Sequence, residues 1–336
     1  MDSLTHIVLG AVVAETTSGK KIGNRALIYG AIAGNLPDFD SVFTPLLSPA
    51  NALFFHRGVS HSFLLVFLLA PIFAFIVSRI DRDKRMEFTD WLLLIALPWL
   101  SHILVDIFNT YGTGIFEPFS NLRVSYDSMA IVDIFLLAGI IPAVVAILLF
   151  GQVKRQRRIF AWIAIGFVAV YISFSVIIKE SLEDRVSSEL HAEGKEYSRI
   201  HTAALPFSNL LWMVVVEDSA GYNVEQRNIL NIDESLLRSR HLKNHQYLEP
   251  LKNDDEIAKL VRFTKGLYTV EKSNKGLVIY DLRYSSLAES YPQAYVFRFE
   301  VNIDGDNVKI SRAHPQRSLS FKNIKRYVHR ILSTQD

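Results

Sequence analysis

The sequence predicts an α-helical multi-pass membrane domain, with four spans plus a short N-terminal helical hairpin, followed by a soluble α+β domain. Three observations lead to this fold class. The 336 residues are 50% hydrophobic and their mean hydropathy is positive, which is more apolar than an ordinary soluble chain. The long apolar runs nearly all lie before about residue 178, and a soluble composition begins near Ser181. We therefore expect a membrane domain at residues 1–179 and a second domain at residues 180–336.

Two short apolar segments open the chain. Residues 4–13 are similar to the core of a signal peptide, but Asp2 stands where a cationic region belongs, so we expect a retained helix. A second segment, residues 26–36, ends at Pro37, because the residue before a proline is disfavoured in the helical conformation. Both are shorter than the roughly 20 residues that a bilayer span needs. A hairpin buried in protein and two full spans both remain open.

Four longer apolar segments approach or reach spanning length. Basic residues are concentrated in the loops at residues 79–85 and 154–158, whereas the loops at residues 37–60 and 108–129 hold one arginine each, Arg57 and Arg123. By the positive-inside rule, the basic loops are cytoplasmic. We therefore expect the other two loops on the external side, together with an extracytoplasmic C-terminal domain. The four predicted spans are residues 62–77, 91–107, 130–150 and 159–178.

The C-terminal part shows strand, turn and helix patterns. Residues 210–216 and 277–282 predict buried strands, and the alternation in residues 295–303 predicts a strand that turns at residues 304–307 into residues 308–311. Helical spacing is found at residues 256–263 and 321–332, and the second helix carries Ile324, Val328 and Leu332 on one stripe.

Net charge and the lack of cysteine limit the chemistry. The chain has 36 Lys and Arg against 34 Asp and Glu, and this net charge of +2 does not indicate a nucleic-acid partner. Because there is no cysteine, a metal ion would be held by histidine and carboxylate side chains. Such ligands suit zinc, manganese or iron, and the number of carboxylates is compatible with two ions.

Ligand-type residues gather before residue 107. Residues four apart on a helix project to the same side, which brings His102 close to Asp106 and His6 close to Asp2. The carboxylates after Pro37 and the segment from His56 to His61 add two more groups at the predicted external face. Taken singly, each group could be a turn, a helix cap or a structural hydrogen bond. Their shared location beside membrane helices favours a metal site.

The six histidines of the C-terminal part have no metal-ligand spacing, and we interpret them as ordinary surface or core residues: His191, His201, His241, His245, His314 and His329.

Four motifs follow one another in the first 106 residues: Asp2-Ser3-Leu4-Thr5-His6, Gly34-Asn35-Leu36-Pro37-Asp38-Phe39-Asp40, His56-Arg57-Gly58-Val59-Ser60-His61-Ser62 and Ser101-His102-Ile103-Leu104-Val105-Asp106. In this order they resemble those of the YdjM-like family of membrane-bound metal-dependent hydrolases, which is described as LexA-regulated and associated with the inner membrane. The resemblance covers about residues 1–150. The overall form, with a soluble tail, is similar to the YfhP-type members of that family.

The resemblance implies a ligand set. The family's pattern of histidine and aspartate is similar to that of zinc-dependent phospholipase C and of the single-strand nucleases with the same fold. The membrane part lacks the His-x-x-x-Glu helix that those enzymes also use, so we expect one or two ions instead of three. Asp40 would be a ligand or a general base. The implied metal ligands are His6, Asp38, His56, His61, His102 and Asp106.

These observations predict a protein of the bacterial inner membrane that hydrolyses an ester through a metal-activated water. The expected ion is zinc, with manganese as the alternative. The base would be a metal-bound hydroxide assisted by Asp40 or Asp106. Arg57 would either bind a phosphate or serve as an interfacial anchor or salt-bridge partner. The expected partners are membrane lipids and a substrate such as a phospholipid or another phosphoester of the envelope.

An interpretation from a different class remains open. The same residues could form a structural or sensory metal site in a non-catalytic membrane protein whose external domain binds a partner. An enzyme needs an open coordination position on the metal, whereas a structural site is closed by protein ligands.

Overall fold

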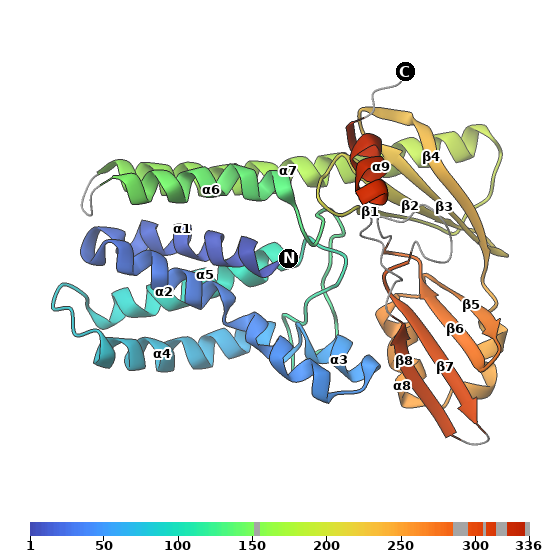
Figure 1. Ribbon diagram of the computed structural model, residues 1–336, viewed down its shortest axis with the longest axis horizontal. Coiled ribbons are helices and arrows are strands. Elements are labelled where there is room, and N and C mark those ends of the chain that lie inside the picture. The colour runs from blue at the N-terminus through green and yellow to red at the C-terminus, as the bar shows by residue number, and fades with distance from the viewer. Residues whose placement is uncertain (151–154, 285–294, 305–306, 314–320, 333–336) are drawn as a thin grey trace. The chain divides into compact units, whose positions relative to one another are not determined.

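The computed structural model describes residues 1–150, 155–284, 295–304, 307–313 and 321–332, and the chain divides into two compact units. The membrane unit comprises residues 1–44, 55–127 and 131–175, and the C-terminal unit comprises residues 45–54, 128–130 and 176–336. Helices make up most of the first unit, and two β-sheets form the centre of the second (Figure 1).

In the part of the chain that the structure describes, three helices are long and apolar enough to span a membrane: α4 (Phe63–Ile80), α5 (Phe88–Asp106) and α7 (Arg155–Ala192). They correspond to three of the four predicted spans. The fourth, predicted at residues 130–150, is the shorter helix α6 (Ile134–Leu149) of 16 residues. It begins late because the Asp133 side chain accepts a hydrogen bond from the backbone N–H of Leu136 and so caps the helix. Four full spans are therefore not confirmed.

The N-terminal hairpin is longer than predicted. Helix α1 (Ser3–Ile22) continues beyond residue 13 and is followed, after Gly23, by α2 (Asn24–Asn35). The two helices cross closely, because a Cβ atom at Gly10 would lie only 2.4 Å from the carbonyl oxygen of Gly30. Likewise, a Cβ atom at Gly34 would lie 2.7 Å from the carbonyl oxygen of His6. Small residues thus bring the start of α1 beside the end of α2.

Helix α5 lies against α1, α2 and α4 and shares one apolar core with them, in which Trp91, Leu94 and Ile103 are buried. A second core joins α1 and α2 to α6 and to the first half of α7, with Val12, Leu27 and Ala161 among its members. Short segments connect these helices: η1 (Pro37–Leu46), α3 (Pro49–Phe55) and η2 (Val59–His61).

A buried ion pair ties α7 to the hairpin. The guanidinium of Arg157 donates to both carboxylate oxygens of Glu15, at 2.9 and 2.8 Å, and to Oδ1 of Asn24 at 2.6 Å. Both charged side chains are almost fully buried. Three hydrogen bonds offset part of the desolvation of the two charges, so each partner depends on the other.

The C-terminal unit holds two four-stranded antiparallel sheets, each with its strands in sequence order. Helices α8 (Asp255–Phe263) and α9 (Phe321–Leu332) and the segment η3 (His245–Leu251) belong to the same unit. The first sheet contains β1 (Arg199–Ala204), β2 (Leu211–Glu217), β3 (Gly221–Asn228) and β4 (Asn231–Leu242), and the second contains β5 (Tyr268–Ser273), β6 (Gly276–Asp281), β7 (Arg298–Asp304) and β8 (Asn307–Ala313).

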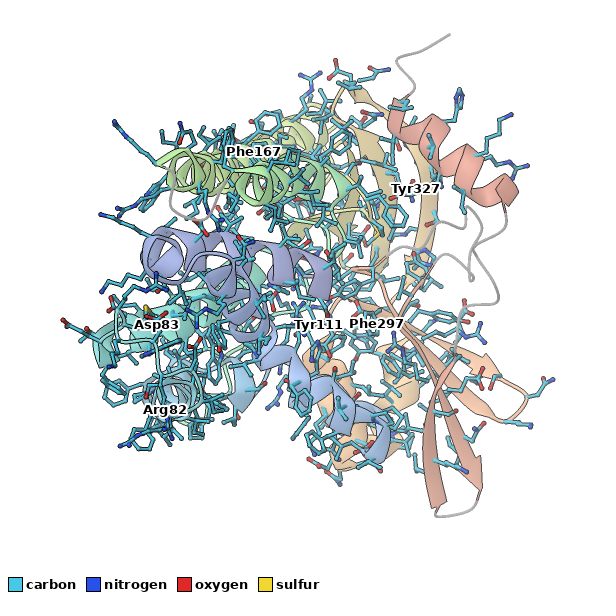
Figure 2. All side chains as sticks on the ribbon, turned by 60° about the vertical axis from the view of Figure 1, so that its left-hand side comes forward. Arg82, Asp83, Tyr111, Phe167, Phe297 and Tyr327 are labelled. Atoms are coloured by element: carbon cyan, nitrogen blue, oxygen red, sulfur yellow. The ribbon has the colours of Figure 1, made fainter. Side chains whose placement is uncertain are left out.

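Most predicted elements of this unit are found. Strands β2, β6 and β8 and helices α8 and α9 match their predicted segments, whereas β7 begins at Arg298 instead of residue 295. Residues 305–306 of the predicted turn lie outside the described residues, as does His314. The core of the unit contains Tyr327 of α9, labelled in Figure 2, while the predicted stripe of Ile324, Val328 and Leu332 is exposed.

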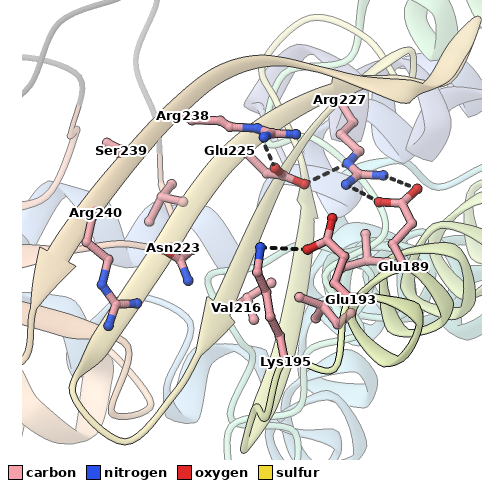
Figure 3. A pocket seen from close by; sticks show the side chains of 13 residues that line it. Glu189, Glu193, Lys195, Val216, Asn223, Glu225, Arg227, Arg238, Ser239 and Arg240 are labelled. Carbon is pink, nitrogen blue, oxygen red and sulfur yellow. Dashed lines mark hydrogen bonds and ion pairs between the residues drawn. The ribbon is translucent and has the colours of Figure 1, made fainter.

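A cavity of about 410 Å³ opens between the end of α7 and the first sheet (Figure 3). Most charged side chains that line the cavity form ion pairs with one another. Arg227 forms ion pairs with Glu189 and Glu225, and Lys195 pairs with Glu193. Such a lining presents little unpaired charge to a ligand.

The Glu15–Arg157 pair gives a test of the helix packing. Replacing Arg157 by methionine leaves the Glu15 charge buried without a partner, which we expect to cost about 3–5 kcal/mol of stability. The double variant Glu15→Leu, Arg157→Met should recover most of that loss. Thermal unfolding of the detergent-purified chain measures both, and equal losses in the single and double variants would contradict a buried pair.

Candidate metal centre

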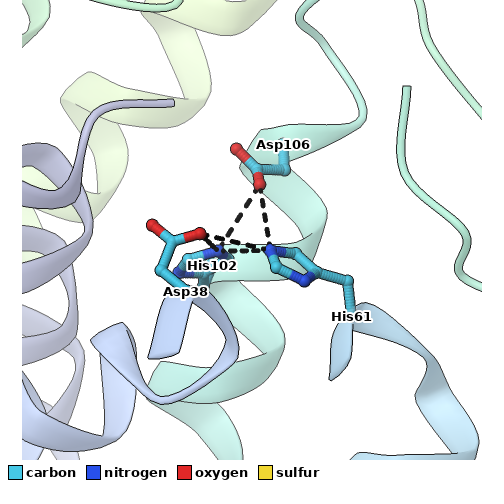
Figure 4. A group of neighbouring side chains, drawn as sticks. All are labelled: Asp38, His61, His102 and Asp106. Atoms are coloured by element: carbon cyan, nitrogen blue, oxygen red, sulfur yellow. Dashed lines mark hydrogen bonds and ion pairs between the residues drawn. The ribbon is translucent and has the colours of Figure 1, made fainter. Parts of the chain in front are cut away.

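Three segments of the membrane unit supply the side chains of the candidate centre. Asp38 lies at the start of η1, directly after the end of α2. His61 ends η2, just before α4, and His102 and Asp106 lie one turn apart at the end of α5. Figure 4 shows that these four side chains point toward one another. All four are buried, and Asp38 alone has measurable exposure, at 8%.

The distances from the two histidine nitrogens to each other and to the two carboxylate oxygens are close to those of a tetrahedral metal site. Nε2 of His61 lies 3.0 Å from Nε2 of His102, and 3.5 Å from both Oδ1 of Asp38 and Oδ2 of Asp106. Nε2 of His102 lies 3.6 and 3.4 Å from the same two oxygens. An ion with bonds of about 2.0–2.1 Å holds tetrahedral ligands roughly 3.3–3.4 Å apart. A single ion therefore fits between these atoms.

In each imidazole, Nδ1 forms a hydrogen bond on the side that points away from the centre. This leaves Nε2, which faces the centre, as the acceptor nitrogen. Nδ1 of His102 lies 2.7 Å from the carbonyl oxygen of Gly34, which can only accept, so Nδ1 carries the proton. Nδ1 of His61 lies 2.9 Å from Oγ of Ser60. In the neutral rings, both Nε2 lone pairs then point at two carboxylate oxygens with no proton between them. Four acceptors that converge in a buried space favour a cation.

The carboxylates support this interpretation. Oδ1 of Asp38 and Oδ2 of Asp106, the two atoms that face the histidines, are buried and have no hydrogen-bond donor in the part of the chain that the structure describes. A buried carboxylate oxygen without a donor is costly unless a positive charge lies beside it. Arg57 Nε lies 3.2 Å from the Asp106 oxygen, whereas the Asp38 oxygen faces the two imidazoles. The residues present therefore fit a divalent metal ion.

Arg57 supplies a positive charge at the edge of the centre. Its Nε lies 3.2 Å from Oδ2 of Asp106, and Nη1 donates to Oδ1 of Asn109 at 2.6 Å. The guanidinium also lies over the ring of Tyr111, with Cζ 5.1 Å from the ring centroid. The Arg57 backbone is left-handed, with φ 61°, a conformation that costs a non-glycine residue roughly 1–2 kcal/mol. These side-chain contacts offset that cost.

Asp40 and His56 form a second layer behind His61. Nδ1 of His56 lies 2.7 Å from Oδ1 of Asp40, and the other Asp40 oxygen accepts from the backbone N–H of Arg57 and from the Ser60 hydroxyl. The same oxygen is 3.6 Å from Nδ1 of His61. Asp40 thus contacts the nitrogen of His61 that points away from the four-atom centre.

His6 flanks the centre on the opposite side. Its ring stacks on that of His102 with centroids 3.5 Å apart, and its Nε2 lies 3.2 Å from Oδ1 of Asp106. The Met1 amino group contacts the same oxygen. Asp106 therefore faces the four-atom centre with one oxygen and His6 with the other. Asp2, which the sequence pairs with His6, caps α1 by accepting from the backbone N–H and hydroxyl of Thr5.

For the site residues outside the spans, these contacts determine the direction of the pKa shifts. Burial raises the pKa of Asp38, but the neighbouring rings of His61, His102 and His6 lower it below its ordinary value overall. For Asp40, burial also raises the pKa, and His56 lowers it by more. Burial lowers the pKa of His61, but the nearby carboxylates of Asp106 and Asp38 favour the charged ring and raise the pKa above its ordinary value.

The structure thus divides the residues named from the sequence into three positions. Asp38, His61, His102 and Asp106 form the one group of histidines and carboxylates that could hold a metal ion among the described residues. His6 and Arg57 contact Asp106, and Asp40 and His56 lie behind His61. Ser60, Asn109 and the Gly34 carbonyl also orient the centre. Ser60 has a sequence signal, because a hydroxyl beside a ligand histidine can bond its ring, whereas the Gly34 carbonyl has none.

Comparison with known proteins gives a family match for the membrane part. The family model described as YdjM inner membrane protein matches residues 1–182. The YfhP protein of Bacillus subtilis (strain 168) is 27% identical over 201 residues, which cover 57% of this chain and 60% of that protein. The inner membrane protein YbcI of Escherichia coli (strain K12) is 30% identical over 112 residues, 33% of this chain and 63% of that protein. The matches therefore span less than two thirds of either relative, and no solved structure matches.

Metal content gives the first test of the centre. Purified wild-type chain should carry about one divalent ion at this site, and the double variant His61→Ala, His102→Ala should lose it because two of four ligands are gone. Elemental analysis of the purified protein measures this. His329→Ala, at an exposed position of α9, is the matched control and should keep the ion. Full metal occupancy in the double variant would rule out this centre.

The pH dependence of metal affinity gives a second test of the centre. Because the pKa of His61 is raised in the metal-free centre, a proton occupies the ring more readily than in an ordinary histidine and competes with the metal. Below that raised pKa, the apparent affinity should fall about tenfold for each pH unit. Chelator competition between about pH 5 and pH 8 measures it. An affinity that stays constant over this range would contradict the role of His61 as a ligand.

Proposed function

This chain belongs to the YdjM inner membrane protein family, and we propose that it is a membrane-bound hydrolase that cleaves an ester with the help of one or two divalent metal ions. The observation that carries the proposal is the convergence of Asp38, His61, His102 and Asp106 on one buried point. The expected substrate is a phosphoester of a lipid or another envelope component.

The donor set favours catalysis over structure. Structural zinc sites in proteins are mostly built from cysteine thiolates, whereas two imidazoles and two carboxylates also suit ions such as manganese that take more than four ligands. A divalent ion held there would lower the pKa of a bound water toward neutrality and make it a nucleophile. Zinc is the first expectation and manganese the second.

We assign separate roles at the centre to Asp38, Asp40 and Arg57. Asp38 is the member of the four that reaches the surface, so we assign the substrate side of the centre to it. Asp40, which the sequence suggests as a base, would act as a positioning residue through Ser60 and His61. Arg57 lies within 3.2 Å of Asp106 and would hold that carboxylate in its orientation.

His6 offers the place for a second ion. Both of its ring nitrogens are buried and lack a hydrogen-bond partner among the described residues, and Nε2 faces the outer oxygen of Asp106. An Asp106 carboxylate shared between two ions would suit a two-metal hydrolysis, in which one ion positions the water and the other stabilises the leaving oxygen. The outer oxygen also accepts from the Met1 amino group and the Asn109 amide, so a second ion would take the place of that amino group.

We also propose that the centre and the C-terminal unit face the extracytoplasmic side of the inner membrane. The distribution of basic residues supports this orientation. The loops at residues 79–85 and 154–158 are basic, and those that carry Asp38, His61 and the residues after Asp106 hold one arginine each.

One observation favours a second function. Four protein ligands already complete a tetrahedral set, and a closed set is typical of a structural or sensory ion. In that case the chain would bind metal without turnover, and its C-terminal unit would engage a partner.

Hydrolysis by the detergent-purified chain separates the two functions. We expect cleavage of bis(p-nitrophenyl) phosphate or of a phospholipid, loss of it with a chelator and recovery with zinc or manganese. Asp38→Asn should lower the rate about a hundredfold or more, because it removes a ligand charge on the substrate side. His329→Ala is again the control.

The non-catalytic function would be favoured by a different result. Metal-replete protein would then cleave none of these substrates, while chelation would lower the temperature of unfolding.

A further inference from the structure

The segment η1 has two chemically different sides. Asp38 and Asp40 are buried, whereas Phe39, Val42 and Phe43 are exposed, Phe39 to 65%. The 3₁₀ geometry has about three residues per turn, so Phe39 and Val42 share one side of the segment, which differs from the sides of Asp38 and Asp40. One side of the segment therefore faces the metal centre, and the other presents aromatic and aliphatic side chains outward.

A second exposed apolar segment is tied to the same site. The backbone N–H of Gly114 donates to the carbonyl oxygen of Arg57, which fixes the loop after α5 beside the centre. That loop exposes Phe116, Phe119 and Leu122. Exposed aromatic residues beside helices that can span a membrane are typical of the membrane interface.

An apolar groove of about 300 Å³ lies on the outer side of α1, α2 and η1. Its lining residues adjoin the site in the sequence: Ile7 follows His6, and Leu36 and Phe39 flank the Pro37-Asp38 pair. Asn35 also lines the groove, and its side-chain carbonyl oxygen is buried without a hydrogen-bond donor among the described residues. The groove thus combines apolar walls with one acceptor that has no partner.

We propose that this groove takes an acyl chain of a membrane phospholipid, and that the ester region of that lipid reaches around η1 to the exposed edge of Asp38. The substrate class would then be a phospholipid that enters sideways from the bilayer, not a water-soluble ester. This statement about the substrate rests on the proposed hydrolase function, whereas lipid binding in the groove does not.

Three observations favour a lipid in the groove. The walls are formed by helices of the membrane unit, in a family of inner membrane proteins. The exposed side chains of η1 and of the loop after α5 make the surroundings of the site apolar, which suits acyl chains and not water. Asn35 can accept a hydrogen bond from a headgroup or glycerol hydroxyl, which phosphatidylglycerol carries.

Helix α2 offers a matched pair of variants. Ile32 and Ile28 are one turn apart on α2 and are exposed to 57% and 59%, but Ile32 alone of the two lines the groove. Ile32→Asn places an amide against the acyl chain without adding bulk. Ile28→Asn makes the same change on the same helix outside the groove.

The measurement is native mass spectrometry of the full-length chain in detergent, delipidated and then mixed with dioleoyl phosphatidylglycerol. Wild type and Ile28→Asn should retain bound lipid, and Ile32→Asn should retain about tenfold less, because burying an unpaired amide is unfavourable. Equal retention by the two variants would overturn the groove as a lipid site.

A second pair of variants guards against local misfolding. Ala31→Phe fills the groove, and Ala169→Phe makes the same change at an exposed position of α7. Ala31→Phe should lose lipid while keeping the metal content of wild type. If Ala31→Phe retains as much lipid as wild type, the groove is not the lipid site.

Activity separates this inference from the function on which its substrate class rests. For Ile32→Asn we expect a KM for phospholipid raised about tenfold and an unchanged rate on bis(p-nitrophenyl) phosphate. If wild type cleaves neither compound, the hydrolase proposal fails, while lipid retention still decides the groove. If wild type cleaves only the soluble compound and Ile32→Asn equals wild type, a phospholipid is not the substrate.

Discussion

Four hydrogen-bond acceptors, two imidazole nitrogens and two carboxylate oxygens, meet in a buried space at the end of α5 without a proton to share among neutral rings. Each would be costly in isolation, because a buried acceptor loses its water and gains nothing in return. A divalent cation removes that cost for all four at once. Much of the membrane unit can be understood as the scaffold that brings these atoms together.

The scaffold acts from several directions. Glycine contacts between α1 and α2 bring the end of α2 close to the start of α1, and the Gly34 carbonyl then orients the His102 ring. Asp40 and Ser60 hold the ring of His61 from the far side, and Arg57 holds Asp106. The outer oxygen of Asp106 remains next to His6. Because His102, His61 and Asp106 are each fixed by a contact behind them, much of the site is organised before any ion binds, which lowers the cost of binding.

The position of the centre links its chemistry to the membrane. η1 carries the site carboxylates on one side and exposed aromatic residues on the other, and an apolar groove lies along its flank. These apolar surroundings agree with the phospholipid that we propose as the substrate. The same features that would be an aggregation risk in a soluble protein are expected where a bilayer covers them.

The sequence predicted those parts of the site that depend on local periodicity. His102 and Asp106 lie on one face of α5 because they are four residues apart on a helix. The long apolar runs in the sequence predicted the positions of α4, α5 and α7. What remained open depends on contacts between distant segments. Asp40 and His56 have the same ligand chemistry as Asp38 and His61, and the loop geometry of η1 and η2 alone places them one layer further out.

Two other differences from the sequence have similar causes. A cap at Asp133 shortens α6, although the apolar run around it is long enough to suggest a span. The strands β3 and β4 carry many polar residues, and their pairing with neighbouring strands outweighs the lack of a hydrophobic alternation. Local propensity is a weak guide where such long-range pairing decides the structure.

The most direct test of the central claim is an X-ray absorption spectrum of the metal in the purified, unmodified protein. Two imidazole nitrogens and carboxylate oxygens at about 2.0–2.2 Å, with at least one further oxygen from water, would agree with an ion held by His61, His102, Asp38 and Asp106. A protein that binds no divalent ion, or one whose spectrum shows no imidazole scattering, would contradict it.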